Sequence, residues 1–315
     1  MNPRNSWLDL LKFIGVFAVV VIHVGPFYHL DDLKPVGVLI NNIMRFAVPC
    51  FFMCTGYFLN SDASLFNKYD NVRIKKNIKK LIVVFFIWNV IYYFLMPQNF
   101  HFTLNTIILG TAPHLWFLSA LIQCLLLKYF FNVIFDRVTI SRKLVFSLSL
   151  SFFLIFYYYF KYCFSDSIYI KSILCVFVFY IYGAIIRCST NMQKPISVAL
   201  IFLGVILQLS ESFLAWKYLS LSPTIDFNFG TLLFSVGVFN LFLIQKSTCS
   251  KLANFGKDSL GVYLIHYYII ILINKLNLDY DVINDILKIF LVFIISYAFT
   301  MFIKKIKYFK LLVGA

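Results

Sequence analysis

A lysine and a histidine lie inside the first apolar segment of the sequence, with ten residues between Lys12 and His23. If the segment is an α-helix, this step turns by about 20° and rises by about 16 Å, so both side chains share one face at different depths. An ionisable side chain is costly in a spanning helix and usually faces the interior of a helix bundle. We therefore treat Lys12 and His23 as candidate functional residues, since imidazole exchanges a proton near neutral pH.

The composition excludes an ordinary soluble protein. The chain has 315 residues, of which 61% are hydrophobic and 13% charged, and its mean hydropathy is +0.85. Apolar runs near twenty residues long are typical of membrane helices. Lipid offers no hydrogen bonds to the backbone, so only helices or a closed barrel can span it, and runs such as 81–95 are too continuously apolar for barrel strands. The sequence predicts an all-α, polytopic helical membrane protein.

We predict about ten transmembrane helices in a single membrane domain that covers residues 1–315. Their expected bounds are 7–28, 37–59, 80–97, 115–135, 144–163, 168–187, 195–216, 227–245, 259–274 and 284–303. Lys and Arg are concentrated near the two ends of the chain and in the even-numbered connections. The odd-numbered connections hold only Lys34, Lys161, Lys171, Lys217 and Lys275. The positive-inside rule therefore predicts that the N- and C-termini are both cytoplasmic.

The formal net charge of +15 is explained by this topology and by attraction to anionic lipid in the bilayer. We expect no binding of nucleic acid, because no basic soluble domain is present to carry it. The cysteines are not spaced as a metal clip, so we expect no metal site and no disulfide framework.

Counting along the predicted helices places the intramembrane polar residues in two layers. Near the external side we expect His23 and Arg45, together with three residues on the acceptor side of a reaction, His114, Trp116 and Glu211. Near the cytoplasmic side we expect Asp9, Lys12 and His266, and the i,i+3 spacing lets Asp9 and Lys12 pair. Two layers suggest transfer of a group from a cytoplasmic donor to an acceptor held nearer the outside.

The cytoplasmic connection 60–79 is strongly basic up to the start of the third predicted helix. We assign to the donor side three residues of the connection and the first residue of that helix: Arg73, Lys76, Lys79 and Lys80. Point charges of this kind suit the phosphates of a cytosolic donor. The same charges would also be present if the segment only sets the topology, and the sequence leaves both interpretations open.

Each candidate has a chemical role and a plainer alternative. His23 would be the general base that removes the proton of an acceptor hydroxyl, and Arg45 would bind an oxyanion. Lys12 would bind donor phosphate, or hold its helix through Asp9. Alternatively, each histidine could bond a backbone carbonyl, and Arg45 could be the structural partner of an acid such as Glu211.

Four segments, in order along the chain, resemble the membrane-bound acyltransferase 3 family. Lys12-x10-His23 is similar to the Arg/Lys-x10-His signature that opens the family. Residues 45–57, from Arg45 through Pro49 to Tyr57, resemble its second helix, with Thr55 where Ser is usual. The segments His114-Leu115-Trp116-Phe117-Leu118 and 259–266, which ends at His266, resemble two later blocks. The chain looks like the small, single-domain O-acetyltransferases of the family.

The resemblance implies an acyl-coenzyme A co-substrate, usually acetyl-CoA, with no bound cofactor. It also implies O-acylation of a cell-surface glycan or its lipid-linked precursor at the bacterial cytoplasmic membrane. It assigns catalytic importance to His23 and a supporting role to Lys12, which stands where many members have Arg. The family's cytoplasmic Arg-x-x-Arg element is matched only as Arg73-x-x-Lys76 or Lys76-x-x-Lys79.

Several alternatives stay open at this point. The acyl group could pass directly to the acceptor or through a covalent protein intermediate, and it could be succinyl instead of acetyl. A protein of another class, an exporter of polysaccharide or lipid-linked sugar, would have many helices too. It differs from a transferase in that it should show a polar path through the bundle. The oligomeric state cannot be read from the sequence.

Overall fold

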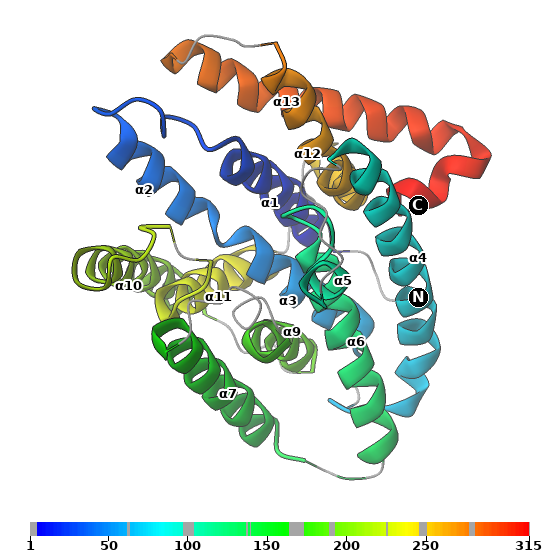
Figure 1. Ribbon diagram of the computed structural model, residues 1–315. Coiled ribbons are helices and arrows are strands. Elements are labelled where there is room, and N and C mark those ends of the chain that lie inside the picture. Colours follow the sequence, from blue (N-terminus) through cyan, green and yellow to red (C-terminus); the bar gives the residue numbers. More distant parts are fainter. Residues whose placement is uncertain are drawn as a thin grey trace. The chain divides into compact units, whose positions relative to one another are not determined.

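The computed structural model describes residues 5–61, 64–96, 104–136, 138, 140–163, 173–188, 193–224, 226–245, 251–276 and 281–314. Every regular element in these ranges is helical (Figure 1), so the prediction of an all-α protein is confirmed. The chain forms two compact units, and it passes from one to the other within a helix, at Phe51. Unit 1 contains residues 1–51 and 192–313, and unit 2 contains residues 52–191.

The helices of the first and last parts of the chain build unit 1. They are α1 (Ser6–Val24), α2 (Lys34–Met44), the start of α3 (Ala47–Leu59), α10 (Lys194–Leu219), α11 (Phe229–Leu243), the 3-10 helix η3 (Lys251–Asp258), α12 (Ser259–Asn274), α13 (Val282–Lys305) and the 3-10 helix η4 (Lys307–Val313). Unit 2 contains the rest of α3, the 3-10 helix η1 (Lys68–Asp70), α4 (Asn71–Leu95), α5 (Leu104–Leu109), α6 (Trp116–Ile134), α7 (Arg142–Cys163) and α9 (Ile173–Arg187).

Among the described residues, seven helical segments are long and apolar enough to cross a membrane, and α9 and α11 include shorter apolar helices. These segments and α7 correspond to the ten predicted spans, and α12 has the predicted bounds, 259–274. A multispanning membrane protein is therefore confirmed. The number of spans and the cytoplasmic side of the termini stay predictions.

The predicted second span, 37–59, is not one continuous helix. It is divided into α2 and α3, and the break lies at Arg45 and Phe46. Pro49 explains the break, because proline has no N–H to donate to the carbonyl of residue 45 and its ring collides with that carbonyl. The N–H of Arg45 bonds to the carbonyl of Asn42, three residues back, at 3.2 Å. The regular hydrogen bonding of an α-helix is therefore interrupted at the arginine.

The predicted start of the third span, residue 80, was also too late, because α4 already begins at Asn71. The second half of the basic connection 60–79 is therefore helical. Ile74, Ile78 and Leu81 are buried on one face of α4, and this spacing of three and four residues is the pattern of an amphipathic helix. Lys and Arg have good helix propensity. The basic residues therefore lie on the first turns of a helix.

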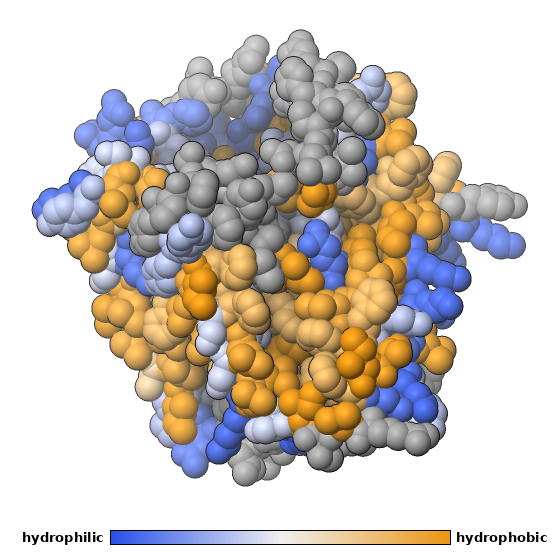
Figure 2. Space-filling model, turned by 60° about the horizontal axis from the view of Figure 1, so that its bottom comes forward, coloured by the Kyte–Doolittle hydropathy of each residue, from blue (hydrophilic) through white to orange (hydrophobic). Residues whose placement is uncertain are grey.

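The surface of α10 has the arrangement expected in lipid. Its buried face carries small and polar side chains, among them Ser197, Gln208 and Ser212, whereas Phe202 and Ile206 are exposed. Figure 2 shows apolar side chains across the middle of the face in view, with hydrophilic ones gathered toward its edges. Small and polar residues between helices, with large apolar ones outside, are typical of helix packing in a membrane.

Helices α10 and α11 are in close contact (Figure 1). A β-carbon at Gly204 of α10 would collide with the backbone of Phe234 in α11. Only glycine permits this distance between the two helices, and the contact holds the helix that leads to the loop at residues 220–228.

We predict that Gly204→Val destabilises unit 1 by roughly 1–3 kcal/mol, because an added side chain forces α10 and α11 apart. The measurement is thermal unfolding of the protein in detergent micelles. Ala199→Val is the matched control, because Ala199 lies on the exposed side of the same helix. Equal melting temperatures for the two variants would contradict the packing described here.

Candidate active site

Helix α1 places Lys12 in its first half and His23 in its last turn. The helix begins at Ser6, where the Asn5 side chain accepts hydrogen bonds from the N–H groups of Trp7 and Leu8, a favourable N-cap. The Lys12 ammonium lies 2.6 Å from Asp9 Oδ1. The side chain of Asp9 is 4% exposed and that of Lys12 23% exposed. The predicted pairing of Asp9 with Lys12 is therefore confirmed, and it compensates a carboxylate that would be costly to bury alone.

The 3-10 helix η3 packs along the first half of α1. A β-carbon at Gly256 would collide with the backbone of Asp9, so glycine lets the two backbones touch. The η3 residue Asp258 is paired with Lys304 of α13. These contacts fix how far along α1 the following helix, α12, begins.

His23 lies against His266 of α12. The centroids of the two imidazole rings are 5.2 Å apart and the rings are tilted by 47°. The ring of Tyr267 is 5.8 Å from that of His23, edge to face. His23 is partly buried, whereas His266 is completely buried. Two imidazoles and a phenol therefore meet at one place inside unit 1.

This position corrects the prediction that His266 shares a layer with Asp9 and Lys12. From Asp9 to His23 the helix rises by about 21 Å. From Gly256, which touches Asp9, to His266 the rise is about 16 Å, because the end of η3 adds about 2 Å per residue. Counting from residue 259 as the cytoplasmic boundary placed His266 too near that boundary.

The tautomer of His266 follows from its hydrogen bond. Its Nδ1 lies 2.6 Å from the backbone carbonyl oxygen of Tyr263. A carbonyl oxygen only accepts, so Nδ1 carries the proton and donates it. In the neutral ring the lone pair then belongs to Nε2.

Arg45 is held at the break between α2 and α3. Its Nε donates to Asn41 Oδ1 at 2.9 Å, and its Nη1 forms an ion pair with Asp226 of the α10–α11 loop. The amide of Asn41 in turn donates to the carbonyl of Ile22 at 3.4 Å. Ile22 precedes His23, so Asn41 connects Arg45 to the turn of α1 that carries the histidine. The two bonds of Arg45 use two of the five guanidinium N–H groups.

The loop that carries Asp226 is itself fixed. Asn42 donates to the carbonyl of Pro223 at 3.0 Å, and its own Oδ1 accepts from Ser212 at 3.1 Å. Gln208 donates to the backbone carbonyl of Asn42 at 2.5 Å. These side chains are buried, where a satisfied polar network is strong and directional. Pro223 and Asp226 of this loop are therefore both bonded to the segment 42–45.

Glu211 is not the acid that pairs with Arg45. Its Oε2 accepts a hydrogen bond from the N–H of Gly230 at 3.2 Å, at the beginning of α11. A carboxylate is favourable there because the first N–H groups of a helix lack partners and the helix dipole is positive. The alternative pairing of Arg45 with Glu211 is replaced by the pair with Asp226.

The other predicted acceptor-side residues belong to unit 2. His114 is 1% exposed, and its ring lies edge to face with that of Tyr92 in α4, with 5.0 Å between the centroids. Trp116 begins α6 and is also buried. Their roles toward an acceptor stay predictions.

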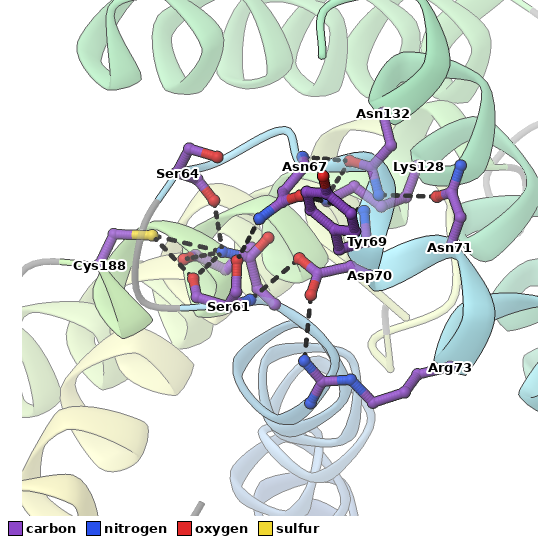
Figure 3. A network of polar contacts seen from close by, with 12 residues as sticks. Ser61, Ser64, Asn67, Tyr69, Asp70, Asn71, Arg73, Lys128, Asn132 and Cys188 are labelled. Atoms are coloured by element: carbon purple, nitrogen blue, oxygen red, sulfur yellow. Dashed lines mark hydrogen bonds and ion pairs between the residues drawn. The ribbon is translucent and has the colours of Figure 1, made fainter. Parts of the chain in front are cut away.

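The predicted donor-side residues lie at the start of α4, also in unit 2. The Arg73 guanidinium is 3.1 Å from Asp70 Oδ1, and the other oxygen of Asp70 accepts from the N–H of Ser61 at 3.0 Å (Figure 3). Lys76 and Lys79 are exposed and Lys80 is partly buried. Asp70, which is buried, thus holds Arg73 at the base of an exposed basic face.

One buried cation, in α6, was not predicted from the sequence. The Lys128 ammonium donates to Asn132 Oδ1 at 2.5 Å and lies over the Phe66 ring at 5.4 Å. Asn132 also donates to Asn71 at 2.8 Å and accepts from the N–H of Asn67 at 3.2 Å (Figure 3). The network ties the segment before α4 to α6. The sequence offered a signal for Lys128, because a lysine inside the predicted span 115–135 is unusual. Asn41 was also not predicted, and its signal was a polar side chain inside the predicted span 37–59.

Comparisons with known proteins identify one family over almost the whole chain. The model of a family described as an acyltransferase domain matches residues 5–305. An amino-acid racemase of Enterococcus faecalis is 32% identical over 131 residues, which is 38% of this chain and 18% of the racemase. A serine/alanine racemase of Enterococcus gallinarum is 30% identical over 43% of this chain and 21% of its own length. The chain thus spans about a fifth of these relatives. No solved structure matches.

We predict that Asn41→Leu destabilises the protein by about 1–3 kcal/mol, because it leaves the Nε of Arg45 and the carbonyl of Ile22 without this buried partner. Thermal unfolding in detergent measures the change. Leu39→Ala, at an exposed position of the same helix, serves as the control. An equal melting temperature for Asn41→Leu and the wild type would contradict this arrangement, because the bridge between α1 and Arg45 would then contribute nothing to stability.

Proposed function

Because the chain belongs to the acyltransferase 3 family, we propose that it moves an acetyl group from acetyl-coenzyme A to a sugar hydroxyl. The acceptor in this proposal is a cell-surface polysaccharide or its lipid-linked precursor, and the enzyme lies in the bacterial cytoplasmic membrane. The observation that carries the proposal is the position of His23. It lies in the last turn of α1, partly buried, with Asn41 connecting this turn to Arg45.

In the proposed reaction His23 takes the proton of the acceptor hydroxyl. The oxygen forms a bond to the thioester carbonyl carbon, and the carbonyl oxygen becomes negatively charged. Collapse of this intermediate breaks the carbon–sulfur bond, and the coenzyme A thiolate leaves and receives the proton. The products are the sugar ester and free coenzyme A, so the atoms and protons balance without an oxidant or reductant. A base positioned in this way typically accelerates such a step by about 10²- to 10⁴-fold.

Arg45 stabilises the oxyanion in this scheme. Its bonds to Asn41 and Asp226 hold the guanidinium before substrate arrives, and preorganised donors are effective in a site from which water is excluded. Lys12 has a supporting role: its ion pair with Asp9 compensates charge in the first half of α1, beside the contact with η3.

The donor contributes phosphates, and the basic start of α4 supplies suitable partners. In the proposal Arg73, Lys76, Lys79 and Lys80 attract the phosphates of acetyl-CoA as point charges. The pair of Arg73 with Asp70 supports this role, because a guanidinium that is held in place loses less entropy on binding. The same charges also favour a cytoplasmic position of this end of α4.

We predict that His23→Ala lowers acetyl transfer by about 10²- to 10⁴-fold while the protein stays folded in the membrane. The measurement uses membranes that contain the chain, acetyl-labelled acetyl-CoA and glycan precursors of the host. His29→Ala is the matched control, since His29 is exposed and lies in a turn outside the helices, and it should transfer label at the wild-type rate.

Two results would contradict this account. Label in glycan at a near-normal rate with His23→Ala would remove the assignment of the base. An absence of coenzyme A release with well-expressed wild type, across several donors and acceptors, would instead favour a protein that exports glycan without consuming a thioester.

A further inference from the structure

The cluster around His23 contains a second imidazole that the reaction above does not use. His266 is completely buried and its ring centroid is 5.2 Å from that of His23. The tilt of 47° between the rings is not the parallel arrangement of stacked rings. At this separation, a rotation of the imidazoles about their Cβ–Cγ bonds can bring a nitrogen of His23 to hydrogen-bond distance, about 3 Å, from Nε2 of His266.

The hydrogen bond at Nδ1 decides what His266 can do. Because Nδ1 donates to the carbonyl of Tyr263, only Nε2 is left to accept a proton or a hydrogen bond. Protonation of Nε2 would make the ring a charged group within a completely buried site, which is costly. His266 is therefore suited to accept a hydrogen bond at Nε2 while it stays neutral.

We propose that His266 is the positioning residue of His23, through a hydrogen bond from an N–H of His23 to Nε2 of His266 that forms when the two rings turn toward each other. A neutral histidine carries one N–H and one lone pair. If the N–H of His23 is directed to His266, its lone pair is on the other nitrogen and is available to the acceptor hydroxyl. The same bond becomes charge-assisted, and therefore stronger, when His23 takes the proton.

The tyrosines on the same helix support this arrangement. Tyr263 provides the carbonyl that fixes the tautomer of His266, and its ring lies 5.8 Å from the imidazole. Tyr267 packs edge to face against His23. Both rings lie against the imidazoles, as expected where a catalytic base is oriented by a second group and that group by a third.

The role of His266 in catalysis rests on the proposed acetyl transfer, whereas the direction of the hydrogen bond does not. The activity test compares three variants in the membrane assay, with kcat and KM for acetyl-CoA measured separately. His266→Asn keeps an amide that can donate to the Tyr263 carbonyl but lacks an acceptor at the position of Nε2. His266→Gln reaches that position with an acceptor, and His266→Leu provides neither group.

We expect kcat to fall at least about tenfold in His266→Asn and His266→Leu, but less than in His23→Ala. The value of KM for acetyl-CoA should stay unchanged, and His266→Gln should recover part of the loss. A wild-type kcat for His266→Asn would overturn the proposal, because a side chain that bonds only to the Tyr263 carbonyl would then support full activity. A loss of kcat in His266→Gln equal to that in His266→Leu would overturn it too.

A second measurement does not need activity. The chain has only five histidines, so nitrogen-15 solid-state NMR of the protein in bilayers can assign each ring from single substitutions. We expect His266 to be neutral with its proton on Nδ1, and its Nε2 signal to shift in His23→Ala but not in His29→Ala. A proton on Nε2, or a signal that His23→Ala leaves unchanged, would overturn the proposal whatever substrate accepts the acyl group.

Discussion

The contact between Gly256 and the backbone of Asp9 determines the register of α12 along α1, and the arrangement of the candidate site depends on this register. A shift of α12 by one turn would displace His266 by about 5 Å along the helix, enough to separate the two imidazole rings. Two ion pairs lie next to this contact in the chain: Asp258, two residues after Gly256, is paired with Lys304, and Asp9 itself is paired with Lys12. Packing near one end of α1 thus positions His23 and His266 near its other end.

A second constraint acts on the polar groups inside unit 1. A polar group buried without a partner is expensive, so Arg45, Asn41 and Asp226 are bonded to one another, and each bond also has a direction. The helix break that Pro49 causes leaves Arg45 at the C-terminal end of α2. The low dielectric that makes unpaired groups costly also makes an oriented guanidinium effective toward an oxyanion.

Much of the fold could be predicted from the sequence, because long apolar runs have few alternatives in a membrane. The bounds of α12 and the pairing of Asp9 with Lys12 follow from hydropathy and helical spacing. The partners of His23 and Arg45 could not be found in this way. His266 is beside His23 because of a glycine contact and a 3-10 helix, and Asp226 reaches Arg45 from a loop. Both depend on tertiary packing, which counting along separate helices does not contain.

The central claim is that the acyl group is transferred at His23 and Arg45 in unit 1. The most direct measurement is an electron cryomicroscopy structure of the purified protein in lipid nanodiscs with a thioether analogue of acetyl-CoA that cannot transfer its acyl group. We predict density for the acyl end of the analogue in contact with His23 and within hydrogen-bond distance of Arg45. An acyl end that is well ordered elsewhere, with no contact to α1, would contradict this account.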